Sequence, residues 1–250
     1  MPITIKSERE IELMTEAGRI LGIVHKELEK ALKPGMSTLD IDALGEEVIR
    51  SYGCEPSFLN YNGYPASICV SVNDEIVHGI PSAKHLIKEG DIVSLDAGVI
   101  YKGYHSDAAR THAVGEIRPD LQKLIDVTRE SFFEGIKFAK KGFRLGDVSH
   151  AIGEFVEKNG YSVVREFQGH GIGESMHEDP GIPNYGKAGR GIRLEPGMTL
   201  AIEPMVIMGN PDILELDDGW TIISEDGSLA AHYENTILIT ENEPEILTLL

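Results

Sequence analysis

A repeat with a constant spacing constrains the fold of this 250-residue chain more than any other feature. The segment "KPGMSTLDIDALGEEVIRSYG" at 33–53 resembles "KKGFRLGDVSHAIGEFVEKNG" at 140–160. Gly35 and Gly142 precede Gly53 and Gly160 by the same interval, and the offset in numbering between the two copies is 107 (142 − 35).

The same offset returns further along the chain. The segment "KEGDIVSLDAG" at 88–98 matches "EPGMTLAIEPM" at 195–205, and this match aligns Asp96 with Glu203, again with an offset of 107 (203 − 96). A fixed offset over such a length indicates a duplicated structural unit. Each copy therefore carries one acid on an equivalent segment.

We predict a single domain of residues 1–250 that consists of two similar halves, about 7–113 and 114–240. Apolar residues recur with helical spacing in four segments, two in each half, at 7–32, 38–52, 119–139 and 146–159. Short β-branched runs such as "SICVSV", "DIVSLDAGV", "MTLAIEP" and "NTILIT" predict strands. Helices followed by strands, twice, indicate an α+β fold.

Composition excludes several classes of protein. The chain has 23 basic and 41 acidic residues, and the net charge of −18 repels phosphate backbones, so we expect no nucleic-acid specificity. Cys54 and Cys69 have no CxxC spacing, which favours two buried thiols over a disulfide or structural zinc. The sequence has neither an apolar leader nor a long apolar run, so we expect a cytoplasmic protein without membrane contact.

Two acids occupy strand positions in the segment 90–113, "GDIVSLDAGVIYKGYHSDAARTHA". If the turn lies at 102–103, Asp96 faces Ala109, and Asp107 becomes its diagonal neighbour on the same face. Buried carboxylates at that separation repel one another. Raised pKa values, a salt bridge to a cation such as Arg110, or a shared metal ion would each explain how the two carboxylates are accommodated. Arg110, however, points to the opposite face of its strand from Asp107 and is therefore badly placed to reach both carboxylates.

Further acids and histidines extend this pattern. Glu203 precedes a proline that keeps the backbone extended, and Glu234 alternates with the apolar residues of "HYENTILIT". His78, His170 and His177 each lie close to glycine or proline, which permits close backbone approach. One such histidine is usually structural, but three beside four strand acids favour a metal site.

The sequence resembles the type I methionine aminopeptidases over essentially its whole length. The motifs that carry the resemblance are "LDAG", "HSDAART", "GHGIG", "AIEP" and "YENT". The resemblance implies the pseudo-two-fold "pita-bread" fold, two similar αβ halves around a central antiparallel sheet. His177 and Glu203 are too close in sequence for the insertion of the type II enzymes, and the zinc-binding extension of eukaryotic type I enzymes is absent, so we expect a bacterial-like enzyme.

The resemblance implies two divalent metal ions, cobalt, manganese, iron or zinc. Asp107 and Glu234 would bridge them, Asp96 would complete one site, and His170 and Glu203 would complete the other. An imidazole with four carboxylates is a donor set suited to such ions. Attack on the scissile amide would come from a hydroxide activated by the pair of metals.

The resemblance also implies roles around the metals. Glu203 is expected as general base, His177 as donor to the scissile amide or its tetrahedral intermediate, and His78 as a contact to the substrate backbone. The methionine pocket would be lined by Tyr61, Tyr64, Cys69 and Trp220, with Phe58 and Met176 close by. An aromatic wall is a suitable surround for a thioether.

The expected function is hydrolytic removal of the initiator methionine from nascent proteins when the second residue is small. Its partners would be the N-termini of nascent polypeptides, with the ribosome as a further candidate, and we expect a monomer. One alternative is an X-Pro aminopeptidase or prolidase, but those relatives carry a large N-terminal domain for which this chain has no room. Another is a non-enzymatic binding protein of the same fold, which would be expected to lose ligands that are all present here.

Overall fold

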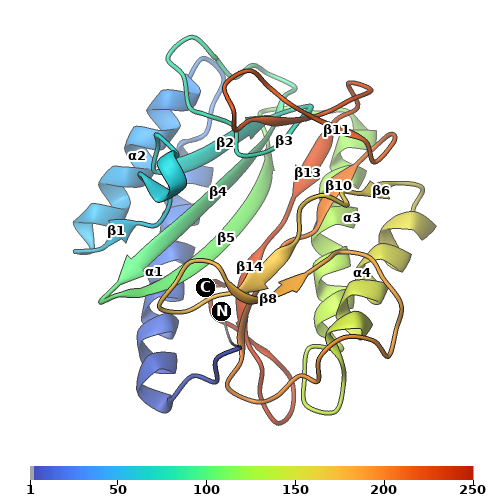
Figure 1. Cartoon of the computed structure of the whole chain (residues 1–250). Coiled ribbons are helices and arrows are strands. Elements are labelled where there is room, and N and C mark those ends of the chain that lie inside the picture. The colour runs from blue at the N-terminus through green and yellow to red at the C-terminus, as the bar shows by residue number, and fades with distance from the viewer. Residues whose placement is uncertain (1–2, 250) are drawn as a thin grey trace.

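Four α-helices flank the strands in the computed structural model, which describes residues 3–249. The helices are α1 (Glu8–Ala31), α2 (Thr38–Ser51), α3 (Pro119–Ile136) and α4 (Leu145–Lys158). In Figure 1, α1 and α2 lie on one side of the central strands, and α3 and α4 lie on the other. All four predicted helices are therefore present, two in each of the predicted halves.

The third helix is shorter than the predicted 119–139. Phe138 and Ala139 donate backbone hydrogen bonds to Gly135 and Ile136, only three residues earlier, so the α-helical bonding pattern ends at Ile136. Capping boxes explain where α1 and α2 begin, with Ser37 and Asp40 at the start of α2. Ser7 and Glu10 form the capping box expected from the sequence at the start of α1.

The strands form four hydrogen-bonded antiparallel sheets within the described residues. One sheet has the order β1-β4-β2 with β5 paired to β4, and the others have the orders β13-β10-β6, β11-β12-β3 and β15-β14-β9-β7-β8. The strands of the first half are β1 (Glu55–Pro56), β2 (Ile68–Val72), β3 (Glu75–Val77), β4 (Ile92–Tyr101) and β5 (Tyr104–Ala113). Those that follow are β6 (Ser162–Val163), β7 (Gly169–Gly171), β8 (Glu178–Ile182), β9 (Thr199–Ile202), β10 (Met205–Ile207), β11 (Ile213–Glu215), β12 (Ile222–Ser224), β13 (Ala230–His232), β14 (Asn235–Leu238) and β15 (Glu245–Ile246).

The hairpin of β4 and β5 has the predicted register. Tyr101 pairs with Tyr104 across the turn, Asp96 pairs with Ala109, and Asp107 pairs with Gly98. Positive φ angles at Lys102 and Gly103, 51° and 87°, are typical of a two-residue turn between twisted strands. The two acids therefore lie as diagonal neighbours on paired strands.

Backbone hydrogen bonds connect the strands of the two halves. The amide of Glu234 donates to the carbonyl of Ala109 at 3.0 Å, and the amide of Ala109 donates back at 3.4 Å. The hydroxyl of Thr236 on β14 accepts a hydrogen bond from the backbone amide of Asp107 at 2.8 Å and donates one to the backbone carbonyl of Asp107 at 2.9 Å. The first sheet is thus joined to the sheet that contains β14.

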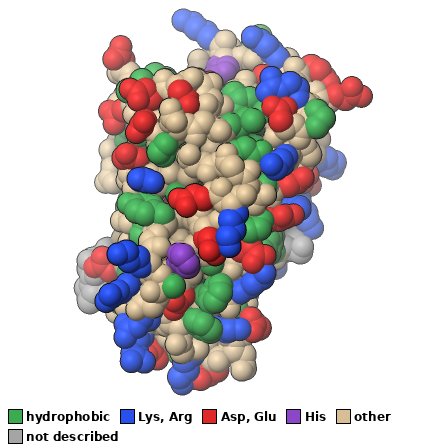
Figure 2. Space-filling model, turned by 90° about the vertical axis from the view of Figure 1, so that its right-hand side faces the viewer, with side chains coloured by type: hydrophobic (Ala, Val, Ile, Leu, Met, Phe, Trp, Pro, Cys, Tyr) green, Lys and Arg blue, Asp and Glu red, His purple; other side chains and the backbone are tan. Residues whose placement is uncertain are grey.

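The surface mixes both signs of charge, as Figure 2 shows for one face. Both cysteines are free and buried, as predicted. Among residues 3–249, none of the helices has the length and apolar character that crossing a membrane requires.

Candidate metal centre

Five acidic and histidine side chains from distant parts of the sequence line one cavity of about 290 Å³. Asp96 comes from β4, Asp107 from β5 and His170 from β7. Glu203 directly follows β9, and Glu234 lies between β13 and β14. The structure therefore brings together all five residues that the sequence suggested as ligands.

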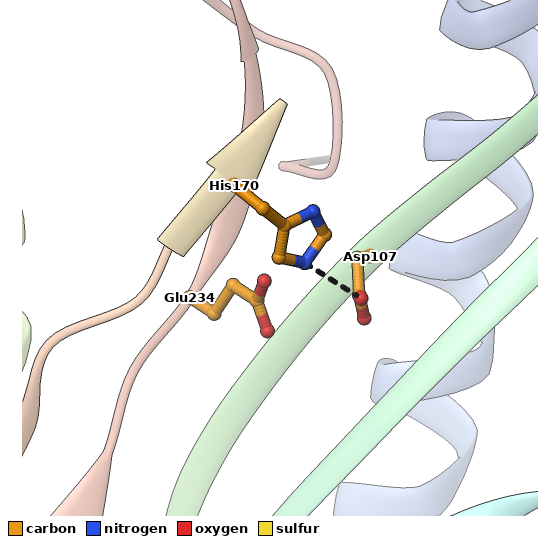
Figure 3. Close-up of side chains that lie close together, drawn as sticks. All are labelled: Asp107, His170 and Glu234. Carbon is orange, nitrogen blue, oxygen red and sulfur yellow. Dashed lines mark ion pairs between the residues drawn. The ribbon is translucent and has the colours of Figure 1, made fainter. Parts of the chain in front are cut away.

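Three of these side chains point toward one another, as Figure 3 shows for Asp107, His170 and Glu234. One donor atom from each lies within 4.8 Å of the donors of the other two, and all three residues are buried. The Nε2 atom of His170 is 3.8 Å from Asp107 Oδ2 and 3.8 Å from Glu203 Oε1. These separations exceed a hydrogen bond and leave space for an ion between the donors.

The imidazole of His170 is oriented by its own backbone. Its Nδ1 donates to the carbonyl of Gly171 at 2.9 Å, which leaves Nε2 to face the acids. A side chain at Gly169 or Gly171 would collide with the carbonyls of Ala201 or Asp179. The glycines of "GHGIG" therefore allow the close strand packing that delivers His170.

The prediction that all four acids lie within strands is wrong for two of them, Glu203 and Glu234. Glu203 lies one residue beyond β9, because Pro204 lacks the N–H that would continue the ladder. Glu234 lies between β13 and β14, and its backbone carbonyl accepts a hydrogen bond from the Arg110 side chain in addition to the one from the Ala109 amide. Arg110 thus contacts the backbone of Glu234, and no ion pair joins it to a carboxylate within residues 3–249.

Burial and mutual repulsion perturb the acids strongly. Burial raises the pKa of Asp96 to about 7. Burial raises the pKa of Asp107 well above its ordinary value, and the carboxylates of Glu234 and Asp96 raise it further. The pKa of Glu203 and that of Glu234 are raised well above normal, again by burial first and then by neighbouring acids. These carboxyl groups ionise together only when cations compensate them.

Unpaired polar atoms show that the residues fit a divalent metal. Asp96 Oδ1, Asp107 Oδ1 and Glu234 Oε1 are buried without a hydrogen-bond partner among the described residues. Leaving such atoms unmatched is unfavourable by about 1–3 kcal/mol each, more for charged groups. Carboxylate oxygens with one imidazole are also the donors that divalent first-row ions accept.

Two more histidines line the cavity. Nδ1 of the exposed His177 and the hydroxyl of Tyr61 form a hydrogen bond of 2.9 Å, and the His177 ring centroid lies 4.1 Å from that of His170. His78 has a positive φ of 61°, which is rare for a residue with a side chain and is common at functional sites. Burial lowers the pKa of His78 to about 4, so this imidazole is neutral near pH 7.

The other end of the cavity is aromatic and apolar. Tyr64 contacts Trp220 edge to face with ring centroids 5.1 Å apart, and its hydroxyl donates to the carbonyl of Gly79 at 2.9 Å. The expected pocket residues all line the same cavity: Phe58, Tyr61, Tyr64, Cys69, Met176 and Trp220. The cavity therefore combines acidic and histidine side chains with aromatic and apolar ones.

His232 is a residue of this site that the sequence reasoning missed. It is 2% exposed, and its Nε2 lies 3.9 Å from Glu203 Oε2 and 4.0 Å from Glu234 Oε2. Its spacing two residues before Glu234 in "HYENT" was the available signal, because residues i and i+2 of an extended segment share a face. Phe167 and Gln168 also line the cavity without having been expected.

Comparison with known proteins agrees with this geometry. The family model of metallopeptidase family M24 matches residues 12–241. The chain is 56% identical over 247 residues to the methionine aminopeptidase of Clostridium acetobutylicum, covering 99% of each chain. It is 51% identical to methionine aminopeptidase 1 of Bacillus subtilis, covering 98% of this chain and 99% of that relative.

A solved structure extends the comparison to the fold. The crystal structure of methionine aminopeptidase from Thermotoga maritima matches with a TM-score of 0.98 and 48% identity, covering 100% of each chain. These similarities confirm the resemblance seen in the sequence and the predicted α+β pita-bread fold. The chain belongs to metallopeptidase family M24, together with the methionine aminopeptidases of bacteria.

Proposed function

We propose that this protein is a metalloaminopeptidase that removes the N-terminal methionine of nascent polypeptides when the second residue is small. The observation that carries the proposal is the cavity in which five potential metal ligands adjoin an aromatic pocket. The high identity to bacterial methionine aminopeptidases supports the same activity. We propose residues 1–250 as a single catalytic domain that acts in the cytoplasm as a monomer, with the ribosome as a candidate partner.

Asp96, Asp107, His170, Glu203 and Glu234 would hold two divalent ions of cobalt, manganese, iron or zinc. When bound, such ions polarise a carbonyl group and lower the pKa of a water molecule. Four carboxylates balance the four positive charges of two divalent ions. This balance accounts for acids that otherwise lie buried and unpaired.

Glu203 is our candidate for the residue that accepts and returns the proton of the attacking water. It lies one residue beyond β9, and its two carboxylate oxygens are 3.8 Å from Nε2 of His170 and 3.9 Å from Nε2 of His232. Near the metals it would be ionised, and it could take a proton as the water attacks. It would then deliver the proton to the departing amine.

The two cavity histidines would contact the substrate. His177 would donate to the scissile amide or its tetrahedral intermediate, and its exposure at the cavity beside His170 supports this role. His78 would contact the substrate backbone. The methionine side chain would lie among Tyr61, Tyr64, Cys69 and Trp220, where sulfur meets aromatic rings.

Specificity would follow from the space that remains. With the α-amine at the metals and the side chain in the aromatic pocket, the second residue of the substrate would meet the rim near His78 and His177. Small second residues should be accepted, whereas overpacking by a large one is unfavourable by about 1–3 kcal/mol. Leucine, lysine or phenylalanine at that position should therefore be rejected.

Three tripeptides test this proposal through their kcat/KM values. Met-Ala-Ser should be cleaved well, Met-Leu-Ser poorly because of its second residue, and Leu-Ala-Ser poorly because of its first. Equal cleavage of the two methionyl peptides would remove the steric argument, and preference for Leu-Ala-Ser would remove the methionine pocket. An Ala-Pro dipeptide is the matched control for prolidase activity, and no cleavage of any peptide would favour the non-enzymatic alternative.

A further inference from the structure

The residue next to His177 is anchored by the N-terminal segment. Glu178 Oε2 accepts a hydrogen bond from Lys6 Nζ at 2.7 Å and another from Thr4 Oγ1 at 2.7 Å. The Lys6 and Glu178 side chains are only 4% and 7% exposed, so this ion pair is buried. The N-terminal segment passes close to β8, where Glu178 begins the strand (Figure 1).

The other carboxylate oxygen of Glu178 holds the loop that leads to His177. Glu178 Oε1 accepts a hydrogen bond from the backbone amide of Ser175 at 3.2 Å. The carbonyl of Ser175 in turn accepts from Gly173 at 3.0 Å, and the carbonyl of Gly173 accepts from His105 on β5 at 2.8 Å. One side chain therefore connects the loop, the N-terminal segment and, through the loop, the hairpin that carries two of the acids.

Glu178 is held in its ionised form. Burial alone would raise the pKa of Glu178, but the hydrogen bonds from Lys6, Thr4 and Ser175 outweigh burial and lower it below its usual value. A side chain at Gly173 would collide with Lys6 and Glu178, so the loop packs directly on the pair. The pair is thus charged, buried and in contact with the loop.

The anchoring matters because the His177 side chain itself is exposed. Its side-chain contacts are the hydrogen bond to Tyr61 and the neighbouring ring of His170. An exposed side chain keeps a fixed position only if its backbone is fixed, and a displacement of about 1 Å at a catalytic group can lower a rate by about 10²-fold. The buried neighbour at 178 supplies that constraint.

We propose that Lys6 and Glu178 form a positioning pair, which holds the backbone of His177 so that its imidazole stays directed at the substrate. The inference rests on the proposed role of His177 in the reaction. Lys6 also donates its backbone amide to Gly197 at 2.8 Å, just before β9, which leads to Glu203. The N-terminal segment therefore contacts the supports of both groups that act on the substrate.

The test removes both charges together, because removing one partner would leave the other buried and unpaired. The variant is Lys6→Met with Glu178→Gln, which keeps the approximate shape of both side chains. The matched control is Arg9→Met with Glu12→Gln, an ion pair on α1 that is 68% and 67% exposed. Each variant is assayed for kcat and KM with Met-Ala-Ser, alone and combined with His177→Ala.

The pair variant should lower kcat about 10-fold and leave KM within about 2-fold, since positioning acts on turnover more than on binding. In the His177→Ala background the same pair variant should cause no further loss of kcat. The control pair should change neither constant. If the double variant does not fold, Thr4→Val removes one exposed donor to Glu178 and should lower kcat about 2-fold, again only when His177 is present.

The outcomes separate this inference from the proposed function. An equal loss of kcat with and without His177 would show a merely structural pair, and an unchanged kcat in the pair variant would also overturn the proposal. If His177→Ala by itself leaves kcat unchanged, the proposed role of His177 fails, and the positioning role fails with it. A loss in His177→Ala without a loss in the pair variant refutes the positioning pair alone.

Discussion

The two halves of the chain share a frame and differ in how they present their acids. Helices α2 and α4 begin at Thr38 and Leu145, and strands β4 and β9 begin at Ile92 and Thr199, so both pairs have the offset of 107 seen in the sequence (145 − 38 and 199 − 92). The amide of Ile87 donates to Met36 at 2.9 Å, and the bond at the equivalent positions, from Leu194 to Phe143, measures 3.0 Å. The duplicated frame is therefore visible in bonding as well as in sequence.

The acids at equivalent positions are held differently. Asp96 lies inside the ten-residue strand β4, with β2 paired on one side and β5 on the other. Glu203, its counterpart, lies beyond the four-residue strand β9 and has a side chain one methylene longer. The comparison teaches that one frame can supply a carboxylate from within a long paired strand in one half and a longer carboxylate from a strand end in the other.

The largest expected effect tests this difference directly. Glu203→Gln should keep the fold and lose at least about 10²-fold in activity, because an amide coordinates weakly and carries no proton. Asp96→Asn should lose activity mainly by losing metal. Activity with Met-Ala-Ser, metal content and thermal melting of both variants are the measurements, and near-full activity of Glu203→Gln would remove its role as a base.

His177→Ala should reduce kcat/KM by about 10²-fold while metal content stays near that of the wild type. The physical reason is that His177 is proposed to act on the reacting amide and not on the metals. Elemental analysis of the purified variant beside its kinetics checks this. A large loss of metal content would instead show that His177 is a metal ligand, and the second half would then supply one more ligand than proposed.

Equivalent glycine substitutions in the two halves should reduce stability by similar amounts. Gly35 and Gly142 have φ angles of 89° and 97°, and neither has an atom within 4 Å of an added Cβ. Substitution of either by alanine should lower the free energy of unfolding by about 1–2 kcal/mol through the backbone alone. Urea unfolding curves of the two variants, with kcat as a control that should not change, would reveal any asymmetry.

A buried histidine on α1 has no counterpart at the equivalent position on α3, and it should make stability sensitive to acid. His25 on α1 is 5% exposed, whereas the equivalent position on α3 is occupied by the buried Phe132. Burial, with the nearby charges of Arg110 and His112, lowers the pKa of His25 well below its ordinary value, so the unfolded chain takes up this proton first as the pH falls.

His25 should therefore not affect stability above its unfolded pKa of about 6.5 and should reduce it below that, by at most about 1.4 kcal/mol per pH unit. Urea unfolding at pH 7.5 and 5.5 measures this for the wild type and for His25→Gln, which should lose less stability between the two values. An equal loss in both proteins would assign the acid sensitivity elsewhere.

The sequence predicted the helices and the register of the β4–β5 hairpin well, because both depend on local spacing. The turn at Lys102 and Gly103 was sufficient to place Asp96 opposite Ala109. The sequence placed the end of α3 too late. The change at Gly135 from hydrogen bonds between residues four apart to bonds between residues three apart does not alter the pattern of apolar residues. The sequence pattern also did not predict that the strands form four separate sheets.

The site was predictable where it depended on motifs and unpredictable where it depended on contacts across the chain. The acids and His170 stand in recognisable short segments, and the structure brings them to one cavity. The buried partnership of Lys6 and Glu178 joins residues 172 positions apart, and nothing in either segment marks it. His232 was overlooked because a single histidine beside an acid is common in buried sites.

The most direct test of the central claim, that this acidic cavity is a metal centre on which the activity depends, is a titration. Protein stripped by a chelator receives Mn²⁺ in steps while methionine release from Met-Ala-Ser is followed. We predict no release before the first addition, a rise with added ion, and saturation by about two equivalents of metal. Full cleavage by the stripped protein would contradict the account.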